Sequence, residues 1–474
     1  LSRVAELVAG AICIGLCLFG IRGRMGYNPI KVSQAYYCED PFLNQLGVNP
    51  VFNLLTSTLD DNRKENRTLH LMSEEDALSK VQKYLHRQGI DRLSPIARKV
   101  EREGTPNRRN VVLVFMESMS ANLMGTFGSD KKLTPYLDSL YQQSLSFSHF
   151  YSSGIHTNHG IYSTLYSFPA IMKRNAMKGS VIPVYSGLPT VLQENGYCNL
   201  FFMTHESQYD NMNAFLRTNG FDEIYAQENY PSEKVVNSFG VQDDFMYQYA
   251  LPILNERAGT GNPFFSVLLS ISNHPPYVIP PYFHPHSDVL EEQIVEYADW
   301  SIRQFMQAAE KQPWFDNTIF VFLGDHGKMV GTPECEMPQS YNHIPLMIYG
   351  KDIKPGVYDG FGGQVDVSPT LLGLLNISYL QNNFGVNLLE EERPCMFFTA
   401  DNLIGARDSV NMFIYSPDSQ QEFKYKLEEG KLHAATGTDE EAFRNLKDYC
   451  FSMLQSTESL VKEHKTLDKV SVKK

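Results

Sequence analysis

The sequence has few of the features that mark nucleic-acid-binding, disulfide-rich or repetitive proteins. It has no long basic run, and its 54 acidic against 41 basic residues give a formal charge of -13. A surface for phosphate backbones is therefore not expected, and nucleic acid is excluded as a partner. Seven cysteines without a C-x-x-C pair do not make a small disulfide scaffold and leave the redox compartment open. The length of 474 residues allows a large core and more than one structural unit.

The longest apolar run, from Leu7 to Ile21, lies near the N-terminus. It is shorter than the ~20 residues that a membrane helix needs. The chain begins at Leu1 rather than at a methionine, and we expect the remnant of the last membrane helix of a longer protein. A signal-peptide core and a buried helix of a soluble protein are the alternatives. Arg22 and Arg24, which follow the run, do not fix the orientation, because the positive-inside rule compares loops.

The changes of pattern along the chain predict four segments. Residues 1–24 are the membrane-helix remnant, and residues 25–109 form a membrane-proximal helical arm in which Ser73 starts a capped helix. Residues 110–385 form the catalytic domain. Residues 386–474 form a C-terminal subdomain with an antiparallel sheet and a closing helix.

Four short apolar runs within residues 110–385 read as buried strands, and each is followed by a residue that could bind a metal or a phosphate. Runs of this kind are typical of parallel sheets covered on both faces, in which the site lies beyond the carboxyl ends of the strands. The runs are Val111–Met116 before Glu117, Leu200–Met203 before His205, Phe264–Ser272 before His274, and Thr318–Leu323 before Gly324-Asp325-His326-Gly327.

Helical segments alternate with these strands, which predicts an α/β fold with a mainly parallel central sheet flanked by helices. The expected helices span residues 134–144, 186–194, 293–311 and 368–375. The rhythm changes after about residue 385, where a small α+β subdomain is expected. Its predicted strands are 397–400, 412–415, 423–427 and 431–434, the last two joined by Glu428-Glu429-Gly430, and its helix runs from Asp439 to Gln455.

Asp325 and His326 supply one carboxylate and one imidazole at a strand end, a mixture that suits Mn²⁺ or Zn²⁺ and, less well, Mg²⁺. Glu117 could complete the same site. Taken alone, Gly-Asp-His-Gly is equally typical of a tight turn whose Asp caps backbone amides. Glu117 alone fits an acid at a helix N-terminus. Their occurrence together, each at the end of a predicted strand, favours the metal site.

A nucleophile is expected in the stretch from Ser152 to Leu165, where a loop leads into a helix. A hydroxyl there would lie near free helix amides that stabilise a bound phosphate. Thr157, Ser163 and Thr164 all carry the required oxygen, and their spacing does not choose between them. A plain helix cap is the alternative role of Thr157.

Together these residues resemble the lipoteichoic acid synthase type of phosphoglycerol transferases, within the alkaline phosphatase and sulfatase superfamily. The resemblance covers roughly Asn28 to Leu380 and includes the stretch that follows the last membrane helix in membrane-bound members. Its motifs are Phe115-Met-Glu-Ser-Met-Ser, Thr157-Asn-His-Gly-Ile-Tyr-Ser-Thr-Leu, Ser272-Asn-His-Pro-Pro-Tyr, Pro313-Trp-Phe-Asp-Asn-Thr, Gly324-Asp-His-Gly, and His343-Ile-Pro-Leu followed by Val365-Asp-Val-Ser-Pro-Thr.

The resemblance implies a role for each matching residue. A single divalent ion is expected, Mn²⁺ first with Mg²⁺ and Zn²⁺ as alternatives, and no organic cofactor. The remaining histidines match residues near the phosphate and glycerol, although a structural role for His343 is an open alternative. The implied metal ligands are Glu117, Thr157, Asp325 and His326, and Thr157 is also the implied nucleophile. His205 and His274 are implied both as catalytic residues and as substrate contacts. His343 is implied as a further substrate contact.

Two departures narrow the expectation. A sulfatase requires C/S-x-P-x-R, whereas this chain has Thr157-Asn-His-Gly-Ile, so sulfatase activity is disfavoured. Lipoteichoic acid synthases present a Trp and an Arg after the residue that matches His205, and this chain reads Ser207-Gln-Tyr-Asp-Asn-Met-Asn. Tyr209 and Arg217 are candidates to replace them. The head group is therefore less certain than the reaction type.

The expected function is transfer of glycerol phosphate from phosphatidylglycerol, an anionic phospholipid donor, to a glycan or polymer hydroxyl through a covalent threonine intermediate. The expected location is a bacterial cell membrane, with the catalytic domain on the extracytoplasmic side. A phosphoethanolamine transferase, a phosphodiesterase or phosphatase and, less favoured, a sulfatase are the enzymatic alternatives. A catalytically silent lipid or glycan sensor is the alternative from another class.

Overall fold

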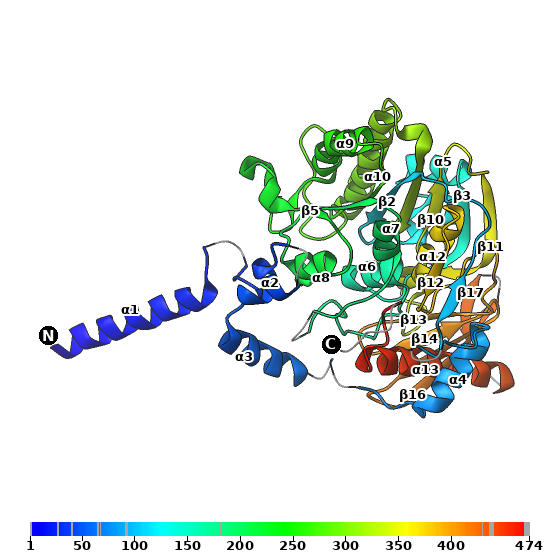
Figure 1. Ribbon diagram of the computed structural model, residues 1–474, viewed down its shortest axis with the longest axis horizontal. Helices are drawn as coiled ribbons and strands as arrows, with labels where there is room; N and C mark the ends of the chain where they lie inside the picture. Colours follow the sequence, from blue (N-terminus) through cyan, green and yellow to red (C-terminus); the bar gives the residue numbers. More distant parts are fainter. Residues whose placement is uncertain are drawn as a thin grey trace.

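A computed structural model of the protein describes residues 2–25, 28–38, 41–63, 66, 68–90, 93–179, 182–428, 430–435 and 440–468. An eight-stranded sheet forms its centre (Figure 1). Across the sheet the strands are β11 (Gly356–Gly363), β3 (Leu145–Tyr151), β10 (Leu346–Tyr349), β9 (Thr318–Gly324), β2 (Asn110–Met116), β8 (Phe264–Leu269), β4 (Cys198–Met203) and β5 (Glu223–Tyr225).

The four strands predicted from apolar runs are neighbours in the order β9, β2, β8 and β4, and all of them run parallel. Every residue of β2, β8 and β9 is buried, which explains why their sequences are continuously apolar. β8 ends at Leu269, so the predicted strand was three residues too long. The prediction missed β10, which runs antiparallel to both of its neighbours and makes the sheet mixed.

The two faces of the sheet bury separate cores, and alternate residues of β2 divide between them because successive strand side chains point to opposite faces. Val111, Leu113 and Phe115 belong to one core, and Val112 and Val114 to the other. The first core includes α6 (Thr157–Tyr166), α7 (Leu188–Glu194), α8 (Met212–Thr218) and α12 (Val367–Leu374); the second includes α5 (Pro135–Gln142), α9 (Asp243–Gly259) and α10 (Leu290–Ala309).

The four predicted helices of this domain are present as α5, α7, α10 and α12, with ends shifted by no more than three residues. Shorter elements complete it: β6 (Val235–Asn237) pairs with β7 (Gly240–Val241), and α11 (Gln339–Asn342) precedes β10. β6 and β7 lie between β5 and α9 along the chain, near the carboxyl ends of the parallel strands.

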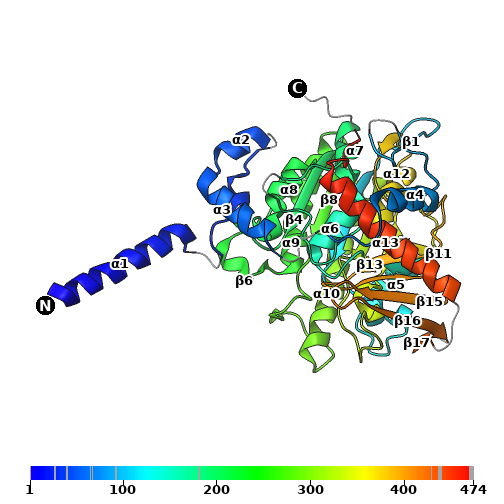
Figure 2. The same cartoon turned by 90° about the horizontal axis from the view of Figure 1, so that it is seen from below.

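The C-terminal part is a separate five-stranded antiparallel sheet backed by α13 (Glu440–Lys462) (Figure 2). Its strands are β13 (Met396–Thr399), β14 (Ile404–Arg407), β15 (Asn411–Ser416), β16 (Gln421–Glu428) and β17 (Lys431–Ala434). The prediction missed β14 and ended the helix too early. Glu429 in the expected turn, Asp439 at the expected helix start and residues 469–474 lie outside the described residues.

At the N-terminus α1 (Ser2–Arg22) is 21 residues long, which corrects the estimate that the apolar segment is too short to span a membrane. Among the described residues this is the one helix long and apolar enough to cross a bilayer. Its side chains are exposed along nearly its whole length, which contradicts the alternative of a buried soluble helix. α2 (Pro41–Leu46) and α3 (Pro50–Asp61) follow it.

The next helix, α4 (Glu74–Tyr84), begins as predicted, with the Ser73 side chain accepting a hydrogen bond from the Asp76 amide. α4 packs against α13, where the rings of Tyr84 and Tyr449 lie 5.0 Å apart. α4 is therefore packed against the body of the protein. The assignment of residues 25–109 to a membrane-proximal arm, like the rest of the four-segment division, stays a prediction.

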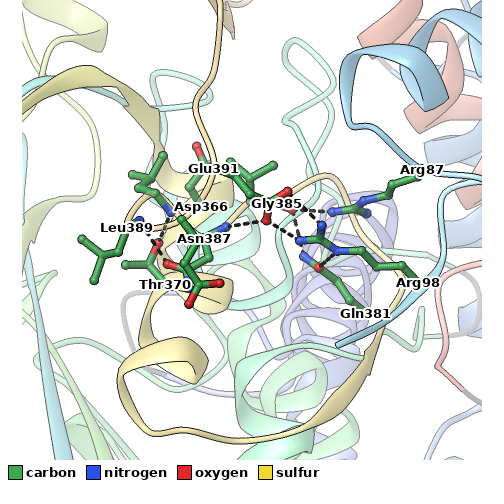
Figure 3. A network of polar contacts seen from close by, with 12 residues as sticks. Arg87, Arg98, Asp366, Thr370, Gln381, Gly385, Asn387, Leu389 and Glu391 are labelled. Atoms are coloured by element: carbon green, nitrogen blue, oxygen red, sulfur yellow. Dashed lines mark hydrogen bonds and ion pairs between the residues drawn. The ribbon is translucent and has the colours of Figure 1, made fainter. Parts of the chain in front are cut away.

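A buried arginine fixes the segment that follows α4 (Figure 3). Arg87 donates to the backbone carbonyls of Ile96, Asn383 and Gly385, and burial lowers its pKa to about 9. Beside it Arg98 forms an ion pair with Glu391 and starts β1 (Arg98–Val100), which pairs with β12 (Tyr379–Gln381). These contacts join Arg87 and β1 to the segment that follows α12.

Candidate active site

Two carboxylates and a histidine meet where β2 and β9 end. Glu117 follows β2, and Asp325 and His326 follow β9; the two strands are parallel neighbours in which Met116 pairs with Gly324. One ligand atom from each of the three residues lies within 4.8 Å of the others. His326 Nε2 is 3.8 Å from Glu117 Oε1 and 3.6 Å from Asp325 Oδ2. The predicted convergence of these residues is thus seen in the structure, while their role as metal ligands stays a prediction.

Backbone amides and a hydroxyl hold the two carboxylates in place. The N–H groups of Ser118 and His326 donate to Asp325 Oδ1 at 2.8 and 2.7 Å. The Ser118 hydroxyl donates to Glu117 Oε1 at 2.7 Å. Ser118 has a φ of +51°. This left-handed conformation costs a non-glycine residue free energy and is found most often at active sites and ligand-binding sites. The turn after β2 is therefore folded around the acidic pair.

The group fits a divalent cation on three observations. Asp325 Oδ2 is buried and has no hydrogen-bond partner among the described residues, although a buried carboxylate oxygen normally has one. His326 uses Nδ1 toward the Gly327 carbonyl at 2.8 Å, which leaves Nε2 with its lone pair for a metal. Burial, and then the neighbouring Asp325, raise the pKa of Glu117 well above its usual value. A bound cation would offset both effects.

Thr157 joins this group from the first residue of α6. Its Oγ1 lies 3.4 Å from Glu117 Oε2. The helix can approach β9 this closely because Gly160 has no side chain: a Cβ there would lie 2.2 Å from the backbone oxygen of Asp325. The free amides in the first turn of α6 add a partial positive charge where a phosphate would bind.

The structure separates the three candidate nucleophiles. Ser163 and Thr164 are fully buried within α6, more than one turn from its start, and the Ser163 hydroxyl donates to the Phe168 carbonyl. Thr157 is the candidate that is partly exposed and next to the acidic group. This arrangement favours Thr157.

His205 and His274 lie in the loops after β4 and β8, and two aromatic rings connect them. The ring of Tyr209 is 4.7 Å from His205 and 6.0 Å from Phe239, which in turn is 4.2 Å from His274. His274 directly follows Asn273, whose side chain donates to the Ser118 carbonyl beside the acidic group. The four rings form an aromatic wall that borders the site.

Both of these histidines favour the neutral state. Burial is the main cause that lowers the pKa of His205 and of His274. Each contacts a backbone carbonyl through Nδ1, at 3.0 Å from Glu206 and 2.6 Å from Pro275 respectively. A carbonyl accepts hydrogen bonds only, so Nδ1 carries the proton and Nε2 is the basic nitrogen of the neutral ring.

His343 occupies a different environment. Its Nε2 donates to the Ser148 carbonyl at 2.9 Å, and its ring stacks on Tyr151 and meets the edge of Phe127, with centroids 5.2 Å away in both cases. Burial lowers the pKa of His343 to about 4. These contacts fit the structural alternative stated for His343, and its role as a substrate contact stays a prediction.

Of the two candidates to replace the missing Trp and Arg, Tyr209 lies at the site and Arg217 does not. Tyr209 contacts His205, and its pKa is raised by burial and then by the charges of Asp210, Glu117 and Asp325. Arg217 is bonded to Asn213 on α8 and lines a polar cavity of about 210 Å³ on the side of the N-terminal segment. The loop sequence alone could not distinguish them.

Sequence reasoning missed three polar residues around the acidic group. The Ser270 hydroxyl accepts from the Glu117 amide at 3.0 Å, and Asn273 donates to the Ser118 carbonyl at 3.1 Å. Lys328 donates to Asn273 Oδ1 at 2.5 Å, and burial lowers its pKa to about 8. The signal for Lys328 was its position directly after Gly324-Asp325-His326-Gly327.

Comparison with known proteins gives consistent results. The sequence model of the family described as Sulfatase matches residues 109–377, more than half of the chain. The lipoteichoic acid synthase-like protein YvgJ of Bacillus subtilis (strain 168) is 25% identical over 362 residues, which cover 69% of this chain and 56% of that protein. A lipoteichoic acid synthase of Staphylococcus aureus (strain USA300) is 24% identical over 400 residues, which cover 74% of this chain and 58% of that protein. The aligned region thus spans somewhat more than half the length of these relatives.

Two solved structures share the fold. One is a protein in the alkaline phosphatase superfamily from Vibrio parahaemolyticus, with a TM-score of 0.75, 25% identity, and coverage of 83% of this chain and 97% of that chain. The other is the lipoteichoic acid synthase LtaP from Listeria monocytogenes, with a TM-score of 0.65, 22% identity, and coverage of 81% and 98%. The predicted fold and the predicted resemblance are confirmed.

Proposed function

The chain belongs to the sulfatase family, and we propose that within it this protein is a metal-dependent phosphoglycerol transferase. The donor is phosphatidylglycerol, the acceptor is a hydroxyl of a glycan or polymer, and Thr157 carries the transferred group. The protein is attached by α1 to a bacterial cell membrane, with the catalytic domain on the extracytoplasmic side. Support comes from the family, from relatives named lipoteichoic acid synthases, and from α1, which is long and apolar enough to span a bilayer.

The observation that carries the proposal is the position of the Thr157 hydroxyl. It lies at the start of α6, 3.4 Å from Glu117, next to Asp325 and His326. Glu117, Asp325, His326 and Thr157 would hold the ion. When bound, a divalent ion lowers the pKa of a nearby hydroxyl and neutralises charge on phosphoryl oxygens.

In the first half of the reaction the Thr157 oxygen forms a bond to phosphorus while the bond from phosphorus to the diacylglycerol oxygen breaks. The proton that Thr157 loses ends on that leaving oxygen. The amides of α6 and the Lys328 ammonium stabilise charge that accumulates on the phosphoryl oxygens. In the second half the acceptor oxygen displaces Thr157, which regains a proton.

His205 and His274 are suited to carry these protons. The basic nitrogen of each neutral ring is Nε2, so the ring can accept a proton from a hydroxyl and return it to an alkoxide. Their lowered pKa values keep the rings neutral, and hence ready to accept, at neutral pH. Of the aromatic wall, His205 is buried and Tyr209, Phe239 and His274 are half-buried, so an acceptor seated against these rings would displace water and favour transfer over hydrolysis.

The test is intact-protein mass spectrometry after incubation with Mn²⁺ and phosphatidylglycerol, followed by peptide mapping. We expect a glycerol phosphate adduct on Thr157, no adduct in Thr157→Ala, and an unchanged adduct in the matched control Thr164→Ala. An adduct on another residue, or normal turnover of Thr157→Ala, would refute the nucleophile. No adduct together with no free diacylglycerol would refute phosphatidylglycerol as donor, and a phosphoethanolamine adduct from phosphatidylethanolamine would then identify the alternative.

A further inference from the structure

The segment that contains α2 and α3 is unusual for a surface in water. From Pro41 to Leu59 the sequence contains no Asp, Glu, Lys, Arg or His. Exposed surfaces of soluble proteins are normally rich in charged residues, and contiguous exposed apolar patches mark contact sites. This segment therefore needs a partner that accepts an uncharged surface.

The apolar side chains of α3 point away from the protein. Val51, Leu54, Leu55 and Leu59 recur at helical spacing and are 66%, 67%, 60% and 69% exposed. The polar side chains of Asn53, Thr56 and Ser57 on the same helix are less exposed than these. The usual arrangement of a surface helix, with the apolar stripe inward, is reversed. On α2, Leu46 adds another side chain that is 69% exposed.

The chain on either side of α2 and α3 is attached to the catalytic domain. Before α2, Asn213 of α8 donates to the carbonyl of Tyr36, and Asn44 of α2 accepts from the amide of Tyr37. After α3, Arg174 donates to the Asn66 carbonyl at 3.3 Å. The exposure of the apolar side chains is thus a property of a segment tied to the body at both ends.

The position of α2 and α3 identifies the partner. In Figures 1 and 2 both helices lie on the side of the molecule from which α1 extends. Both helices lie near the end of α1 in the two views, so a bilayer that contains α1 is within reach of both. A reversed amphipathic helix beside a membrane span fits the interface of that bilayer.

We infer that α2 and α3 lie on the surface of the bilayer that holds α1, with Leu46, Val51, Leu54, Leu55 and Leu59 inserted among the lipids. The inference rests on the membrane attachment in the proposed function. Because this face carries no basic residue, its binding depends on apolar area and is insensitive to anionic lipid and to salt.

This contact also orients the active site. Arg24, just after α1, forms an ion pair with Glu206, and Asn28 donates to the same carboxylate at 3.0 Å. Glu206 directly follows His205 at the border of the site. Two attachments to the bilayer, through α1 and through α3, restrict rotation of the catalytic domain about α1 and hold the His205 loop near the lipid donor.

The test places a tryptophan in the full chain, in liposomes of uncharged phosphatidylcholine with doxyl groups near the lipid headgroups. The variant Leu55→Trp probes α3, and Val357→Trp is the matched control. Val357 is 52% exposed, similar to Leu55 at 60%, but lies on β11 at the far end of the molecule from α1 (Figures 1 and 2). The unsubstituted chain gives the background of Trp300 and Trp314.

We expect the added emission of Leu55→Trp to shift to shorter wavelength and to lose most of its intensity through doxyl quenching, with no change when anionic lipid is included. The added emission of Val357→Trp should be unaffected. Equal quenching in the two variants would overturn the inference. It would also be overturned if the blue shift of Leu55→Trp depended on protein concentration rather than on lipid, because the face would then contact a second copy of the chain.

Failure of this inference can be told apart from failure of the proposed function. Flotation of the chain with liposomes reports insertion of α1, and the Thr157 adduct reports the chemistry; neither requires α3 to touch lipid. Chain that floats, forms the adduct and shows no quenching would refute the role of α3 alone. Chain that does not float would refute the membrane attachment and this inference together.

A double variant, Leu54→Asn with Leu55→Asn, gives a further check. It should turn over lipid in liposomes more slowly than the native chain and turn over detergent-solubilised lipid at the native rate.

Discussion

Replacing Gly160 by alanine tests whether the contact between α6 and the end of β9 positions the nucleophile. The new Cβ would lie 2.2 Å from the carbonyl oxygen and 2.9 Å from the carbonyl carbon of Asp325, whereas ordinary contacts begin at 3.4 Å. Both atoms belong to the backbone, so no change of rotamer relieves the overlap. In a close-packed interior α6 and the Asp325 turn must separate by about 1 Å.

The expected loss of activity follows from that displacement. Thr157 stands one turn before Gly160, and its Oγ1 is already 3.4 Å from Glu117. A misplacement of about 1 Å in an active site can cost about 100-fold in rate. Stability should change much less. Overpacking costs about 1 to 3 kcal/mol, and alanine regains about 1 kcal/mol of helix propensity over glycine.

The assay is the initial rate of diacylglycerol release from phosphatidylglycerol with Mn²⁺, normalised to the folded fraction from thermal unfolding. Gly259→Ala in α9 is the matched control, because nothing lies within 4 Å of its Cβ position. We expect Gly160→Ala to fold cooperatively and turn over about 100-fold more slowly, and Gly259→Ala to keep the native rate. A native rate in folded Gly160→Ala would show that this contact does not position Thr157.

Three further predictions concern the metal, pH and the buried arginine. Chelation of the ion should lower the unfolding temperature of the native chain but not of Asp325→Asn, and equal shifts would argue against an ion at Asp325. Burial lowers the pKa of His343 to about 4 and of His159 to about 3, both below the usual 6.5. At acidic pH the unfolded chain therefore binds more protons than the folded chain. The contribution of these histidines to the free energy of unfolding is complete above pH 6.5 and decreases as the pH drops toward 4. In urea unfolding at pH 7 and pH 4.5, His343→Phe should show a shallower fall than the native chain, and an identical fall would exclude His343 as a source. Arg87→Met should cost about 3 kcal/mol in urea unfolding because buried carbonyls lose their donor, without lowering activity per folded molecule, whereas the exposed Arg108→Met should cost little; equal costs would contradict the network of Figure 3.

In the central sheet the sequence predicted the parallel strands with continuous apolar runs and missed β3 and β11, whose composition is mixed. β2 and β9 are buried on both faces, so their apolar runs were visible without any partner. β3 carries Ser146, Ser148 and His149, and β11 contains four glycines, so neither has the composition of a core strand. These strands form because neighbours pair with them, which single-sequence patterns do not report.

At the site, too, the sequence predicted some residues and missed others. Glu117 and Asp325 could be brought together from the sequence because parallel neighbours end at one edge of a sheet. The contacts of Ser118 and Lys328 depend on the path of loops, for which the sequence offers no period. The metal group was therefore predictable as a set, whereas the groups that hold and tune it were not.

The loop contacts of Lys328 bear on which lipid head group the site would accept. Lys328 is fixed by Asn273, next to His274, and its ammonium lies 5.7 Å from the ring of Tyr277. A fixed cation attracts the phosphate of any donor, but it repels a second cation such as ethanolammonium. In the proposed function the aromatic wall would contact the carbons and hydroxyls of glycerol. Lys328 and the aromatic wall would together contact the head group, and the Lys328 charge would favour an uncharged glycerol over a cationic head group.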